Sequence, residues 1–147
     1  TDEEYRIITH WLAQGAPVPA DMQPSAAASE QIKRWESFLN GTDNKQKLVS
    51  RYIYEHLFIG HMHFKGTDQR EFYRLVRSTT PPGQPVDEIA TVRPYDDPGA
   101  VFYYRLQRFP GDIVAKTHIV YVLSDERLAR YRELFIKPKY EVAALPS

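Results

Sequence analysis

The sequence contains no cysteine. Disulfides, thiolate zinc sites, cysteine nucleophiles and covalent haem attachment through a Cys-x-x-Cys-His motif are therefore excluded within these residues. Neither charge is in excess, because the sequence has 19 Lys and Arg residues and 19 Asp and Glu residues. A broad electrostatic attraction to nucleic acid is not indicated, and we expect no nucleic-acid partner. No apolar run approaches the roughly 20 residues that a membrane-spanning helix needs.

Several familiar catalytic signatures are also missing from the sequence. It has no Gly-x-Ser-x-Gly elbow, Walker loop, dinucleotide glycine fingerprint or His-Glu-x-x-His motif. What is present is an ordinary balance of 42% hydrophobic and 26% charged residues in a chain of 147. This length allows one sizeable core with a possible appendage. Because the chain begins at Thr1 rather than at a methionine, we expect it to be an internal piece of a longer polypeptide.

The first half of the chain has the periodicity of helices. A helix is expected over residues 1–14, and Pro-rich and Ala-rich residues 16–28 predict an extended linker. A second helix is expected over residues 29–39, with Ser29 as its N-cap and Asn40-Gly41 at its end. Residues 44–64 are apolar on almost every side of a helical wheel, which predicts one long, buried central helix.

The second half is rich in Val, Ile, Tyr and Phe bounded by Pro, Gly and Asp, which indicates strands. Strands are expected over residues 71–78, 88–92, 101–108, 113–116 and 118–123. A tight turn is expected at Pro110-Gly111-Asp112, and Ser124 is expected to cap a closing helix over 125–135. The whole predicts an α+β fold: N-terminal helices including a long buried one, then a small, mostly antiparallel sheet and a closing helix. We expect a boundary between residues 1–28 and a domain of residues 29–147.

Three of the five histidines lie in the expected central helix. On that helix His56 and His63 would face the same way, but about 10 Å apart along the axis, too far to share one metal ion. His61 would face away and be solvated. His56 is then either a hydrogen-bonded core histidine or a ligand completed from elsewhere, for example by Glu55 or His118. His118, on an expected strand, is equally open to lining a site or to a structural role.

The basic residues of the second half allow two interpretations. Arg74 and Arg77 are oddly spaced and must point to opposite faces of a strand, so one of them could pair with Glu55 or Asp87 while the other meets solvent or a ligand. Arg93, Arg105 and Lys116 could add to a basic cluster suited to a phosphate or carboxylate. Alternatively, these residues form structural ion pairs with the nearby acids, Asp87, Glu88, Asp96 and Asp97. The Asp96-Asp97 pair beside Pro98-Gly99 is most simply a turn.

Several blocks of the sequence occur together in a recognisable order. They are Lys47-Leu-Val-Ser-Arg-Tyr-Ile-Tyr-Glu-His-Leu-Phe58, Phe72-Tyr-Arg-Leu-Val-Arg77, Thr80-Pro-Pro-Gly83, Asp87-Glu-Ile-Ala-Thr91, Arg93-Pro-Tyr-Asp-Asp-Pro-Gly99 and Lys116-Thr-His118. Together they resemble the bacterial fatty acid cis/trans isomerases. The stretch His10-Trp-Leu-Ala-Gln-Gly-Ala-Pro17 also resembles the terminal helix of a c-type cytochrome module.

The resemblance implies a periplasmic enzyme that carries covalently attached haem c and converts cis double bonds of phospholipid acyl chains to trans. Because this chain has no cysteine, the haem would be attached outside it, and the fragment alone would be inactive. Partners would be an unsaturated phospholipid or free fatty acid, the membrane surface and the missing haem-bearing region.

Residue roles under this resemblance are hypotheses from residue type and location. His56 and His118 are the catalytic candidates, and His56 or Met62 could approach the iron. The candidates for substrate binding are Tyr52, Arg74, Arg77, Arg93, Tyr104, Arg105 and Lys116, with Ile59 and Phe64 as further apolar contacts. An alternative makes the chain a non-catalytic scaffold or lipid-docking module, and a more distant one makes it a histidine-dependent metalloenzyme.

Overall fold

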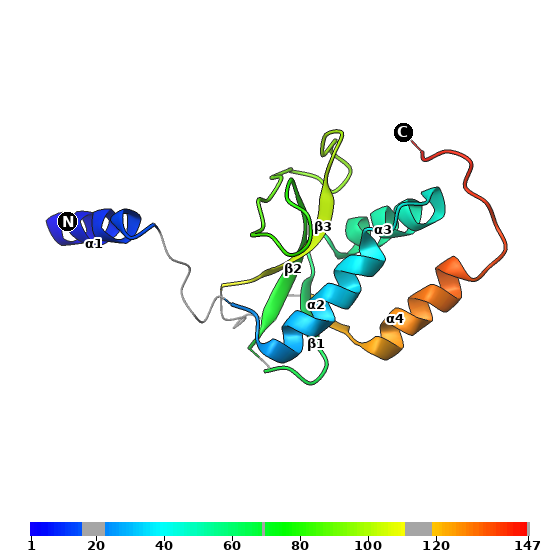
Figure 1. Cartoon of the computed structure of the whole chain (residues 1–147), viewed down its shortest axis with the longest axis horizontal. Coiled ribbons are helices and arrows are strands. Elements are labelled where there is room, and N and C mark those ends of the chain that lie inside the picture. Colours follow the sequence, from blue (N-terminus) through cyan, green and yellow to red (C-terminus); the bar gives the residue numbers. More distant parts are fainter. Residues whose placement is uncertain (16–22, 69, 111–118, 147) are drawn as a thin grey trace.

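The computed structural model describes residues 1–15, 23–68, 70–110 and 119–146 (Figure 1). The helices of these residues are α1 (Asp2–Ala13), α2 (Ala26–Leu39), α3 (Asn44–Leu57) and α4 (Asp125–Tyr131), and α4 continues into a π-helical turn, η2 (Arg132–Ile136). The strands are β1 (His61–Phe64), β2 (Phe72–Ser78), β3 (Tyr103–Arg108) and β4 (Val120–Leu123). Helices precede a small sheet and a closing helix follows it, so the predicted α+β class is confirmed.

The four strands form one mixed sheet in the order β3-β2-β1-β4. β2 pairs antiparallel with both β1 and β3, whereas β1 pairs parallel with β4. Alternate side chains of all four strands are buried on one face, as the two-residue period of a strand requires. These are Met62, Phe64, Tyr73, Leu75, Tyr104, Leu106 and Leu123.

Helices α2 and α3 supply the other layer of the core. Their buried apolar residues are Ala28, Trp35, Phe38 and Leu39 from α2 and Val49, Ile53, Tyr54 and Leu57 from α3. They join the buried face of the sheet in one hydrophobic cluster, which Leu128 of α4 completes. Full burial of each such side chain contributes roughly 1.5–3 kcal/mol, so this helix-on-sheet contact is the main source of stability.

The start of α2 differs from the prediction. Ser25, not Ser29, is the N-cap, and its side chain accepts a hydrogen bond from the backbone N–H of Ala28. The difference is explained by Glu71, which directly precedes β2. Its carboxylate accepts hydrogen bonds from the backbone N–H and the hydroxyl of Ser25. This tertiary contact fixes Ser25 as the cap, so residues expected in the linker are helical. The predicted end of the helix at Asn40 is confirmed.

The expected long helix over residues 44–64 is wrong in its second half. α3 ends at Leu57, and His61–Phe64 form β1 in the middle of the sheet. Gly60 lies between the two elements, and a Cβ built on it would lie 3.3 Å from the carbonyl oxygen of Leu57. The alternation His-Met-His-Phe carries the period of a strand, with Met62 and Phe64 fully buried. His63 therefore does not share a helix face with His56, and His61 is buried rather than solvated.

Other predictions of single elements had mixed outcomes. The helix expected over residues 1–14 is confirmed by α1, and the predicted cap Ser124 of α4 is also confirmed. The expected strand over 88–92 is absent, and only an isolated bridge joins Glu88 to Ser78. The expected strand over 113–116 and most of the turn beginning at Pro110 lie outside the described residues.

Helix α1 contributes nothing to the core. None of its residues is buried, and it lies apart from the sheet (Figure 1). The proposed boundary after residue 28 stays a prediction. Across the described part of the chain, no helix combines the length and hydropathy needed to cross a bilayer.

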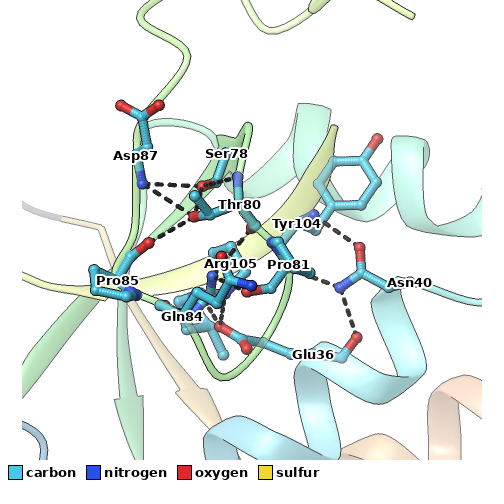
Figure 2. Close-up of polar contacts among 11 residues, drawn as sticks. Glu36, Asn40, Ser78, Thr80, Pro81, Gln84, Pro85, Asp87, Tyr104 and Arg105 are labelled. Carbon is cyan, nitrogen blue, oxygen red and sulfur yellow. Dashed lines mark hydrogen bonds and ion pairs between the residues drawn. The ribbon is translucent and has the colours of Figure 1, made fainter. Parts of the chain in front are cut away.

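A buried arginine shapes the loop that follows β2 (Figure 2). The guanidinium of Arg105 on β3 donates to the carbonyl oxygens of Thr80, Pro81 and Gln84. It also forms an ion pair with Glu36 of α2, with 3.0 Å between Nε and Oε1. This side chain is therefore structural, and the prediction that Arg105 binds substrate is not supported by its contacts.

Candidate functional site

Two cavities border the end of β2, and Arg77 lines both of them. The larger has a volume of about 600 Å³, within the range of small-molecule sites. Its lining comes from the ends of α2 and β3, the loop before β3, the outer side of α3 and the C-terminal segment. Its lining residues are Leu39, Asn40, Gly41, Thr42, Lys47, Arg51, Arg77, Pro94, Tyr95, Asp96, Asp97, Pro98, Ala100, Val101, Phe102, Tyr103, Tyr104, Leu145 and Pro146. We call this cavity the groove.

The groove combines apolar walls with a few charged groups. Tyr95, Val101, Phe102 and Leu145 give it a largely apolar lining. The carboxylate of Asp96 accepts from the backbone N–H of Arg93, and that of Asp97 accepts from Gly99. Both acids thus stabilise the turn that the sequence predicted. The lining is suited to an elongated apolar ligand that has a polar end.

The C-terminal segment is held against α3 and thereby closes one side of the groove. Arg51 donates to the carbonyl oxygen of Pro146 and forms an ion pair with Glu55, one turn further along α3. Asn44 donates to the carbonyl oxygen of Ala143. These contacts position Leu145 and Pro146 in the groove wall.

Arg77 is the buried cation of this site, with only 4% of its surface exposed. Its Nη1 donates to the carbonyl oxygen of Asp96 at 2.8 Å, and its Nη2 donates to Thr91 Oγ1 at 2.8 Å. The guanidinium carbon lies 4.9 Å from the ring centre of Tyr54 on α3. Among the described residues, no carboxylate forms an ion pair with Arg77.

Two buried tyrosines lie beside Arg77. The rings of Tyr54 and Tyr104 are 5.3 Å apart, and Tyr104 lines the groove as a substrate-binding candidate should. Burial raises the pKa of Tyr104 to about 12, although the positive charge of Arg77 opposes this shift. Burial also raises the pKa of Tyr54. Both phenols are therefore neutral at physiological pH, and neither supplies the negative charge that Arg77 lacks.

The smaller cavity, of about 310 Å³, is also lined by Arg77. Arg74 and Ile59 line it, but Arg74 forms an ion pair with Glu88 at 2.7 Å and also donates to Gln107. The pairing with Glu88 agrees with the structural interpretation of the basic residues, whereas the expected partners Glu55 and Asp87 are not used. The opposite orientation of Arg74 and Arg77 is confirmed by the alternation of β2, in which Arg77 follows the buried residues Tyr73 and Leu75 while Arg74 is only partly buried.

The catalytic candidate His56 does not lie in either cavity. It is exposed on α3, where its Nδ1 is 2.7 Å from the carbonyl oxygen of Tyr52. The half-exposed Tyr52 ring packs on His56 and on Phe135 of η2. The expectation of a core position for His56 is wrong, because α3 is shorter and turns this side outward. Tyr52 likewise lies away from the groove.

The other candidates divide into core, surface and undescribed residues. Phe64 and Met62 are fully buried in the core and are closed to any ligand or iron. Arg93 is exposed, with its guanidinium 5.8 Å from the ring centre of Tyr95. Lys116 and His118 lie outside the described residues. No group of three or more metal-binding side chains occurs within the described ranges.

The structure therefore brings together two of the predicted site residues, Arg77 and Tyr104, at one groove. Sequence reasoning missed the apolar wall formed by Tyr95, Val101 and Phe102. Tyr95 lies in the block from Arg93 to Gly99, while Val101 and Phe102 lie at the start of the expected strand over 101–108, so no single pattern in the sequence marked the three as one wall.

The fold and the groove define an α+β domain with a ligand-sized apolar cavity bordered by a buried arginine. A family model described as fatty acid cis/trans isomerase matches residues 1–147. The chain belongs to the fatty acid cis/trans isomerase family, as its sequence blocks predicted. No curated protein and no solved structure matches the chain.

Proposed function

We propose that this chain forms the acyl-chain-binding part of an isomerase that converts cis to trans double bonds in unsaturated acyl chains of membrane phospholipids. The observation that carries the proposal is the groove of about 600 Å³, with apolar walls and the buried cation Arg77, in a member of this family. Apolar walls remove an acyl chain from water, and each buried CH₂ group contributes about 0.8 kcal/mol.

Within this proposal, the groove positions the chain and excludes water. Val101, Phe102 and Tyr104 would contact the hydrocarbon, while the polar end of the lipid would lie toward the cationic part of the groove. Tyr104, as a neutral phenol of raised pKa, adds apolar surface without adding charge. Reduced access of water also protects a reacting double bond from side reactions.

The residues of this chain do not fit covalent haem c, because thioether attachment needs thiols and the sequence has none. We therefore propose that the haem belongs to a region outside this chain, in a periplasmic polypeptide, and that this region is the chain's partner. The chain alone would bind substrate without isomerising it. A second candidate function, a lipid-docking scaffold, is favoured by one observation: His56 lines neither of the two cavities that border β2.

Binding to the purified chain tests the groove. We expect saturable 1:1 binding of oleic acid, measured by displacement of a fluorescent fatty acid below its critical micelle concentration. The product analysis by gas chromatography should show no trans acid from the chain alone. The polypeptide that contains this chain should form trans acid and absorb light as a haem protein. Absence of oleic acid binding would refute the groove as the acyl site, and binding without any turnover in the longer polypeptide would support the scaffold.

A further inference from the structure

Arg77 is a buried cation whose described surroundings provide no acidic partner. Burying an unpaired charge is costly, so such groups are normally paired or coordinate a ligand. Here the compensating groups are the Asp96 carbonyl, the Thr91 hydroxyl and the side chain of Tyr54, through both its ring and its hydroxyl. All three are neutral. Arg105 is about as buried as Arg77, but it forms an ion pair with Glu36. The buried arginine with a structural role therefore has a carboxylate partner, and Arg77 does not.

Arg77 also retains hydrogen-bonding capacity. A guanidinium carries N–H donors on all three nitrogens. One bond from each Nη is formed, and the buried Nε has no hydrogen-bond partner in the described part of the molecule. An oxyanion is the group that satisfies several guanidinium donors at once, through paired charge-assisted hydrogen bonds.

We propose that Arg77 is the oxyanion anchor of the groove: it binds the anionic end of a single-chain lipid whose hydrocarbon lies along the apolar wall. The inference rests on the proposed function and adds the residue that determines which lipids are held. The anion is a carboxylate or a phosphate, since both accept hydrogen bonds from a guanidinium in the same way.

The groove suits this lipid better than the smaller cavity does, because its volume is about 600 Å³ rather than about 310 Å³ and it has an apolar wall that includes Val101, Phe102 and Leu145. Charge alone does not distinguish the two cavities, since the charged residues of each lining leave one positive charge in excess. They are Arg74, Arg77 and Glu88 in the smaller cavity and Lys47, Arg51, Arg77, Asp96 and Asp97 in the groove. An acyl chain without a charged end would bury carbon equally well but leave the Arg77 donors unsatisfied.

Three ligands with the same hydrocarbon isolate the contribution of the anion. Oleic acid has a carboxylate, oleoyl lysophosphatidic acid has a phosphate, and methyl oleate has neither. We expect the full 147-residue chain to bind at least one of the two anionic lipids about tenfold or more tightly than methyl oleate, the effect of a charge-assisted hydrogen bond. Whichever anion is preferred identifies the source of the oxyanion.

Arg77→Gln should abolish this preference, because it should weaken the binding of the anionic lipid and leave the binding of methyl oleate at the wild-type level. The retained methyl oleate binding shows that the variant is folded. Arg6→Gln is the matched control, because it removes the same charge from an exposed position on α1 and should preserve the preference.

A second measurement needs no stable variant. The Nε–H resonance of Arg77, in spectra of arginine-labelled wild-type chain, should shift on titration with the anionic lipid and not with methyl oleate.

The outcomes separate the two proposals. If the anionic lipids and methyl oleate bind with equal affinity and the Arg77 resonance does not move, the anchor is refuted while the acyl groove stands. If none of the three lipids binds, the proposed function itself fails. If Arg77→Gln and Arg6→Gln weaken the binding of anionic lipids equally, the effect comes from overall charge, and the anchor is also refuted.

Discussion

The side-chain amide of Asn40 pairs with both backbone polar groups of Tyr104. Its Nδ2 donates to the Tyr104 carbonyl oxygen at 2.9 Å, and its Oδ1 accepts from the Tyr104 N–H at 2.9 Å (Figure 2). Glu36, one turn earlier on α2, accepts from the N–H of Leu106 in the same way. Two side chains thus occupy the outer edge of β3, where an unpaired strand edge would otherwise be open to another chain.

Asn40→Ala should destabilise the fold by about 1–3 kcal/mol, because it leaves partly buried backbone groups of Tyr104 without partners. The measurement is urea unfolding followed by tryptophan fluorescence. Asn44→Ala is the control: Asn44 also bonds one backbone carbonyl, but at an exposed site, and its loss should cost about 0.5 kcal/mol or less. Equal effects of the two substitutions would contradict a special role for the Asn40 bridge.

Arg105→Met should be more damaging than the loss of any surface arginine. It leaves the Glu36 carboxylate buried without its cation, a change that costs about 3–5 kcal/mol. Burial already raises the pKa of Glu36, and removal of Arg105 would raise it further. The damage should therefore be smaller at pH 4, where Glu36 can protonate, than at pH 7.

Combining Arg105→Met with Glu36→Gln tests this explanation. The Gln amide oxygen can still accept from the Leu106 N–H, and no buried charge remains. The double variant should be more stable than Arg105→Met alone at pH 7 in urea unfolding. A double variant that is less stable would show that packing, and not the uncompensated charge, determines the loss.

The sequence predicted those parts of the fold that depend on local patterns. The cap at Ser124 and the strands near 72–78 and 103–108 follow from nearby residues, and all are present. The cap at Ser25 was missed because the Glu71 carboxylate that holds it is distant in sequence. β1 was missed because a four-residue apolar alternation after a helix fits either period, and only pairing with β2 and β4 decides it.

The site was less predictable than the fold for the same reason. The odd spacing of Arg74 and Arg77 predicted opposite faces, but spacing does not reveal that Arg74 meets Glu88 while Arg77 meets a carbonyl, a hydroxyl and a ring. Arg105 looked like a ligand-binding residue because its partners, Glu36 and the loop carbonyls, come from other elements. Residue type predicted a cation, and only tertiary structure distinguishes a structural cation from one facing a cavity.

Because of Glu71, the free energy of unfolding should depend on pH in the acid range. Burial alone would raise the pKa of Glu71, but hydrogen bonds from Tyr73 and Ser25 outweigh it and lower the pKa below its ordinary value. A lowered folded-state pKa contributes stability that is present above the unfolded pKa of about 4.3 and is lost as pH falls through the folded value. Glu71→Gln should therefore destabilise the chain more at pH 7 than at pH 3, measured by urea unfolding. An equal loss at both pH values would show that Glu71 titrates alike in the folded and unfolded chain.

Filling the groove should block an acyl chain without unfolding the protein. Val101 lines the groove and is 68% exposed, so Val101→Trp can place its ring across the opening at little cost to the core. We expect about a tenfold or greater loss of affinity for oleic acid, because the groove would bury several fewer CH₂ groups. Val92→Trp is the matched control: Val92 is 88% exposed in the same loop and lines neither cavity. Both variants should unfold at the wild-type urea midpoint. A loss of oleic acid affinity shared by the two would point to the loop as a whole, whereas unchanged affinity in Val101→Trp would place the acyl chain outside this groove.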